Sequence, residues 1–169
     1  MHKETVRAAL LLALMIVFQS LRLFVPLPPF ISMFLVGSII NACLLLTIEF
    51  STLRAGVIIA CLAPVIAFMQ QALPLPIFIL PVALTNVCYL TSYKALAEKN
   101  YIAAIVTASI VRMLTLYLAS SAIFAVFKFQ SELENILRIA MSWPQLITGI
   151  LGGVLTITIV RLASKTNLS

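Results

Sequence analysis

One arginine lies in the middle of a long apolar run, where a charge is costly. Arg112 follows the start of the run 101–127 by eleven residues, about 16 Å along a helix axis. A guanidinium at the centre of a bilayer costs about 2.5 to 3.5 kcal/mol, so it usually faces a cavity or a partner. Because the nearest intramembrane carboxylate, Glu49, belongs to the end of another run, Arg112 is a candidate counter-charge for an anionic ligand. The alternative is an arginine that snorkels or caps carbonyls of a neighbouring helix.

A stripe of polar side chains follows one face of the run 76–96. Asn86, Tyr89 and Tyr93 occur at i, i+3 and i+7 and therefore share one face of a helix. An asparagine amide offers two donors and an acceptor, which suits recognition of a neutral heterocycle or an amide in apolar surroundings. The alternative is hydrogen bonding between helices, which is common for these residues in membranes and contributes about 0.6 to 2 kcal/mol.

Polar residues give way to small residues along the beginning of the run 139–162. Gln145 is the member of this segment that we expect to contact a ligand, with Thr148 on the same side. Gly149 and Gly153 form a small-xxx-small pair, a spacing that lets two helices approach closely. We therefore expect the two glycines to serve helix packing.

A second small-residue pair lies near the N-terminus. Ala9 and Ala13 are separated by three bulky leucines, in an otherwise large-residue segment. Small residues at i and i+4 allow another helix to pack closely against this face. The pair is a candidate docking site.

The elements that carry these residues must be membrane helices. The chain has 169 residues, of which 63% are hydrophobic and 9% charged, whereas soluble domains carry about 25% charged residues. A span needs about 20 apolar residues, and backbone groups in lipid are satisfied within helices. The sequence predicts an all-α integral membrane protein in which residues 1–169 form a single domain. Its six expected spans are 6–24, 31–49, 54–72, 76–96, 101–127 and 139–162.

The basic residues predict the orientation of the chain, because lysine and arginine in short loops stay on the cytoplasmic side. Placing both termini in the cytoplasm puts seven basic residues inside and three outside. The net charge of +6 is therefore interpreted as a topology signal and not as a nucleic-acid footprint. The inner residues are Lys3, Arg7, Arg54, Lys94, Lys99, Arg161 and Lys165, and the outer ones are Arg22, Lys128 and Arg138.

Prolines cluster at the junctions that this orientation places outside. Pro26 and its neighbours follow the first span, Pro74 and Pro76 separate the third and fourth, and Pro144 lies near the start of the sixth. Proline removes a backbone donor and bars continued helix. We expect shaped outer connections above a pocket and plain turns on the inner side; the alternative is that the prolines only end helices.

Residues for catalysis or metal binding are scarce. The single histidine is His2, aspartate is absent, and Cys43, Cys61 and Cys88 fall in three different runs without metal-ligand spacing. We therefore expect no enzyme activity, no metal site and no cofactor.

The whole chain resembles the substrate-binding S components of energy-coupling factor vitamin transporters. The resemblance rests on the size, six spans with both ends inside, the Ala9–Ala13 step and the proline-rich first outer loop. It also includes Pro81 followed by Asn86, and a last span with Pro144, Gln145, Gly149, Gly152 and Gly153.

The resemblance implies a high-affinity binding subunit in the cell membrane for a vitamin or related micronutrient. Ala9 and Ala13 would contact a separate transmembrane coupling protein, which is driven by two cytoplasmic ATPases. Trp143 is the single tryptophan, whereas a thiamine binder of this family would be expected to have several around its pocket. The pocket candidates also include no acid that could neutralise a cationic ligand, so a neutral or anionic ligand is favoured. The implied pocket residues are Phe30, Gln71, Asn86, Tyr89, Arg112, Gln145 and Thr148.

Two other functions fit a small membrane protein of this composition. A stand-alone carrier or channel would use Arg112 in a polar route to both membrane faces. A membrane scaffold would use the polar residues only for packing and would bind no small molecule.

Overall fold

A computed structural model describes residues 2–25 and 28–166, and these residues form helices and connections without a β-strand. The predicted all-α fold is confirmed. A 3-10 helix, η1 (Pro76–Phe78), precedes the fourth α-helix. The α-helices are α1 (His2–Phe24), α2 (Pro29–Phe50), α3 (Leu53–Met69), α4 (Ile79–Ala97), α5 (Tyr101–Val126), α6 (Ser131–Ala140) and α7 (Pro144–Thr166).

The lengths and surfaces of these helices indicate a multi-pass protein embedded in a membrane. Within the described residues, five helical segments are long and apolar enough to cross a bilayer. α3 is also apolar, but its 17 residues span only about 26 Å, against a hydrocarbon core of about 30 Å. Large apolar side chains point outward, as in α1, where Leu10 is 64% and Val17 61% exposed. A surface of this kind is stable in lipid and not in water.

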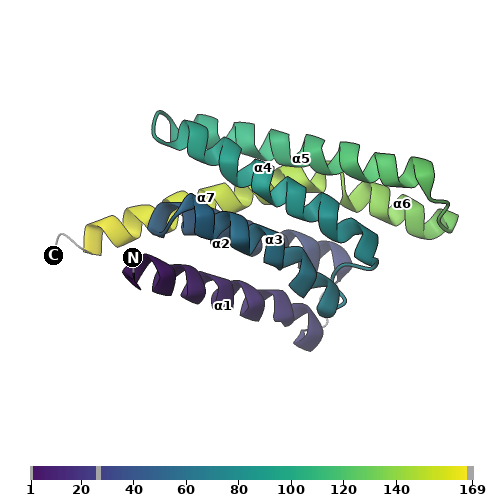
Figure 1. Ribbon diagram of the computed structural model, residues 1–169, viewed down its shortest axis with the longest axis horizontal. Coiled ribbons are helices and arrows are strands. Elements are labelled where there is room, and N and C mark those ends of the chain that lie inside the picture. Colours follow the sequence, from purple (N-terminus) through teal and green to yellow (C-terminus); the bar gives the residue numbers. More distant parts are fainter. Residues whose placement is uncertain (1, 26–27, 167–169) are drawn as a thin grey trace.

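The long helices form one bundle (Figure 1). α2 packs against α1 and α7, and α4 packs against α3 and α5, while α1 lies at the edge of the bundle. We call the end where α1 begins and α7 ends the terminal end, and the opposite end the distal end. α1, α3 and α5 all end at the distal end, where α6 also lies (Figure 1).

Connections at the two ends differ, as the distribution of prolines predicts. The turns at the terminal end are short, and each is followed by a capped helix. Thr52 Oγ1 accepts a hydrogen bond from the Ala55 amide, and Asn100 Oδ1 accepts from the amides of Ile102 and Ala103. At the distal end, prolines begin α2, η1 and α7; Pro26 lies outside the described residues.

The segment before the last long helix differs from the prediction. Most of α6 occupies residues that the sequence placed in a connection, and its last two residues were predicted as the start of the last span; α7 begins at Pro144 and not at residue 139. The break follows from Pro144, which starts a helix well but disfavours helical backbone in the residue before it. α6 is amphipathic: Leu137 is 5% exposed and faces the bundle, whereas Ile136 is 65% exposed.

Glycines hold α7 close to its neighbours, which confirms the packing role predicted for Gly149 and Gly153 and adds Gly152. A Cβ at Gly149 would lie 2.7 Å from Ser109 Oγ on α5, and one at Gly153 would lie 2.6 Å from Ile105. A Cβ at Gly152 would lie 2.6 Å from the Cβ of Asn41 on α2. The three glycines therefore pack α7 between α2 and α5, with no room for a methyl group.

Candidate ligand-binding site

A cavity of about 320 Å³ lies inside the bundle, lined mainly by residues from the distal halves of the helices. All the long helices, α6 and the connection after α3 contribute to its wall. Ligand pockets usually occupy about 300 to 1,000 Å³, so this one suits a small molecule. The lining residues are Gln19, Arg22, Met33, Gly37, Ile40, Asn41, Ala63, Pro64, Ala67, Ala72, Leu73, Pro74, Val82, Asn86, Arg112, Leu116, Leu137, Ala140, Met141, Gln145 and Thr148.

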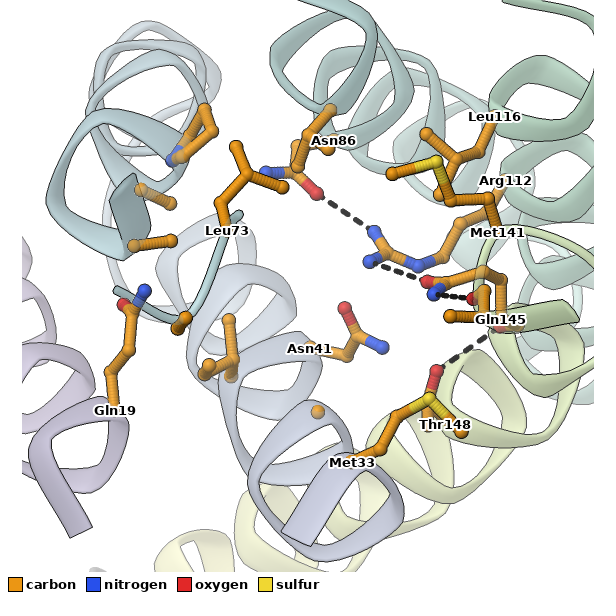
Figure 2. A pocket seen from close by; sticks show the side chains of 18 of the residues that line it. Gln19, Met33, Asn41, Leu73, Asn86, Arg112, Leu116, Met141, Gln145 and Thr148 are labelled. Carbon is orange, nitrogen blue, oxygen red and sulfur yellow. Dashed lines mark hydrogen bonds between the residues drawn. The ribbon is translucent and has the colours of Figure 1, made fainter. Parts of the chain in front are cut away.

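Arg112 is a buried charge in the wall of this cavity, held by neutral groups. Its side chain extends from α5 toward the centre of the site (Figure 2), and the residue is 8% exposed. Nη1 donates to Asn86 Oδ1 at 2.8 Å and Nη2 to Gln145 Oε1 at 3.2 Å. The guanidinium carbon lies 5.3 Å from the centroid of the Tyr89 ring. No carboxylate among the described residues lies within 4 Å, so its charge is free to attract an anion.

The polar stripe on α4 divides into one cavity residue and two packing residues. Asn86 lines the cavity, and its Nδ2 donates to the Ala60 carbonyl at 3.2 Å, which ties α4 to α3. Tyr89 is fully buried outside the lining and donates to the Gly149 carbonyl at 2.8 Å. Tyr93 donates to Glu49 Oε1 at 2.8 Å. The two tyrosines therefore join helices, while Asn86 both joins helices and orients Arg112.

Gln145 and Thr148 line the cavity from the first turns of α7 (Figure 2). The Gln145 amide nitrogen donates to the Ala140 carbonyl at 2.8 Å, so this side chain connects α7 to the end of α6. Thr148 is 2% exposed, and its hydroxyl donates to the Gln145 carbonyl at 3.3 Å. The structure thus brings these two residues, Asn86 and Arg112 together around one space.

Besides Tyr89, two further predicted pocket residues lie outside the lining. Phe30 is 54% exposed in the first turn of α2, and its ring lies 6.1 Å from that of Phe34. Gln71 is exposed in the turn after α3, where its φ of 57° reverses the chain. Because of that reversal, the connection lines the cavity through the following residues, Ala72, Leu73 and Pro74, and not through Gln71.

Three polar lining residues were not predicted. Gln19 and Arg22 come from consecutive turns of α1, and Asn41 comes from the middle of α2. Gln19 and Asn41 are uncharged polar residues within apolar runs. Arg22 was used only as a loop charge in the prediction of the orientation. The spacing of three between Gln19 and Arg22, which puts them on one helix face, is the signal that would have found them.

Comparison of this chain with protein-family models, curated proteins and solved structures found no match. The described residues contain no group of three metal-ligating side chains, and the three cysteines are free. The chemistry of the site is therefore that of its lining: one buried guanidinium on α5, several amides, a hydroxyl, a second arginine on α1 and a large aliphatic wall. That set can bind a small polar or anionic molecule and offers no nucleophile beside a general base.

Proposed function

We propose that this chain is the substrate-binding S component of an energy-coupling factor importer for a vitamin or related micronutrient. In this account it has six spans, with α3 as the sixth, and both termini lie in the cytoplasm. The distal end then faces the outside of the cell, where the cavity can collect its ligand. A separate transmembrane coupling protein and two cytoplasmic ATPases supply the energy.

The observation that carries the proposal is a cavity with several polar groups, closed toward the terminal end by a floor of packed side chains. Moving from the cavity toward the terminal end, Asn41 on α2 is followed by Leu44 and Leu45, and Asn86 on α4 by Leu90 and Tyr93. Each of those four following residues is fully buried. A carrier or channel needs a polar route to both faces, whereas a binding subunit needs a closed site. The packed floor favours the binding subunit.

The surface of α1 supplies a docking face for the coupling protein. Ala9 and Ala13 are both exposed, while Ala8 and Met15, on a different side of the helix, pack into the bundle. α1 contacts only α2 and α3 extensively, so its small-residue side is open to another helix. Small residues at this spacing allow close backbone approach in lipid, where packing drives helix association.

Replacing Ala9 and Ala13 together by leucine tests this docking face. We expect co-purification of the coupling protein and its ATPases to fall at least roughly tenfold, because two added isobutyl groups block close helix approach. Ligand affinity should stay within about threefold, since neither residue lines the cavity. The measurement is affinity purification from native membranes, with quantification of the partners and titration of the ligand.

A control with two exposed alanines is available on the far side of the bundle. Ala103 and Ala122 are exposed alanines on α5, which lies across the bundle from α1 (Figure 1). The pair of leucine substitutions there should leave co-purification unchanged. Equal loss of co-purification in both double variants would reject α1 as the docking face. Intact co-purification in the Ala9/Ala13 variant would reject it as well.

A further inference from the structure

The cavity contains a second arginine that faces the same space as Arg112. Arg22 lies in the last turn of α1, three residues after Gln19, and both line the cavity. The Nε atom of Arg22 is buried without a hydrogen-bond partner, and so is that of Arg112. No residue among those that line the cavity is acidic. Two guanidinium groups on different helices therefore make the described wall positive.

Two amide side chains near these arginines lack protein partners. Asn41 is 0% exposed, and both its Nδ2 and its Oδ1 are buried without a hydrogen bond. Gln19 is 3% exposed, and its Oε1 is also without a partner. Figure 2 shows Asn41 between Gln19 on one side and Arg112 with Gln145 on the other. A buried polar group without a hydrogen bond is unfavourable, so these atoms are available to a polar group of a ligand.

The remainder of the lining is aliphatic. It contains no aromatic ring, so the cavity offers no face on which a flat heteroaromatic ring could stack. Methionine, leucine and valine side chains instead form a surface that adapts to a saturated body. Typical members are Met33, Leu73, Val82, Leu116, Leu137 and Met141.

We propose that the ligand is a small organic anion with a saturated body, whose negative charge is attracted by Arg112 and Arg22 in the cavity wall. Asn41 and Gln19 bind a polar group on the body, such as an amide or a hydroxyl. This inference rests on the proposed function and narrows its substrate class. This inference makes Arg22 a binding residue, whereas in the sequence analysis it was used only to predict the orientation of the chain.

Matched acid and neutral probes test the substrate class. The pairs are biotin with biotinamide, pantothenate with pantothenol, and nicotinate with nicotinamide as the flat aromatic pair. Binding is measured by thermal stabilisation and titration of the purified chain in detergent. We expect at least one saturated acid to bind at least roughly thirtyfold more tightly than its neutral counterpart, and nicotinate to bind weakly.

Two variants assign the charge contacts. Arg22→Gln and Arg112→Gln should each weaken the binding acid at least roughly tenfold and leave its neutral counterpart nearly unaffected. Arg161→Gln removes an exposed arginine on α7 outside the lining and should change nothing.

Three outcomes overturn this inference. They are a neutral probe that binds as tightly as its acid, preference for nicotinate over the saturated acids, and an affinity for the acid that Arg22→Gln does not change. Failure of every acid to bind would also reject this substrate class. The proposed function is judged separately, by co-purification with the coupling protein.

Discussion

Arg112→Ala lowers the affinity for an anionic ligand by about 2 kcal/mol or more, roughly thirtyfold, if the site works as proposed. The guanidinium is buried and hydrogen-bonded only to the neutral side chains of Asn86 and Gln145. Its charge is therefore available to the ligand in a medium where water screens it little. The measurement is ligand titration of wild-type and variant protein by isothermal calorimetry in detergent.

Arg112→Lys is the informative companion to this variant. Lysine keeps the charge but cannot reproduce the planar fork that reaches Asn86 and Gln145 at once. Affinity should fall between those of the wild type and Arg112→Ala. Unchanged affinity in Arg112→Ala would instead make Arg112 a purely structural residue that joins α4, α5 and α7.

Gly152→Ala destabilises the protein by about 1 to 3 kcal/mol through overpacking, despite the better helix propensity of alanine. The added Cβ would lie 2.6 Å from Asn41 Cβ and 2.9 Å from the Ser38 carbonyl oxygen. Backbone cannot yield as a side-chain end can, so α2 and α7 must separate. Because Asn41 lines the cavity, ligand affinity should fall as well. Unfolding in mixed detergent with and without ligand measures both effects.

Gly56→Ala provides the control for this prediction. Its added Cβ would lie 3.0 Å from Ile48 Cδ1 and 3.3 Å from Leu90 Cδ1, both ends of flexible side chains. We expect stability within about 1 kcal/mol of the wild type and unaltered ligand binding. An equal loss of stability in the two variants would contradict this prediction, because it would show that the methyl group is no more costly at Gly152 than at Gly56.

The sequence predicted the helices well, and α6 shows where that prediction failed. Long apolar runs force helices because lipid cannot satisfy backbone groups. α6 has Glu132, Glu134 and Arg138 among its ten residues, so a search for apolar runs passes over it. Only the pairing of Leu133 and Leu137 marks it as an amphipathic helix. Both pack in the apolar cluster at the distal end that includes Phe78 and Phe124.

The candidate site was predicted in part, because only some of its residues differ from their sequence surroundings. Arg112, Asn86 and Gln145 stood out because their polarity conflicts with apolar surroundings, and the bundle brings all three together. Phe30 and Gln71 were implied by the family resemblance, from their place beside outer loops. The local direction of a loop depends on backbone angles that residue type does not reveal. Asn41 was missed because a lone amide inside an apolar helix is common, and its role depends on what surrounds it.

Native mass spectrometry of the protein, purified gently from membranes of cells supplied with a vitamin mixture, tests the central claim most directly. The account predicts a one-to-one adduct of micronutrient mass in the wild type that is lost in Arg112→Gln. A spectrum with only the mass of the chain, from protein that also fails to gain stability with any component of the mixture, would contradict it.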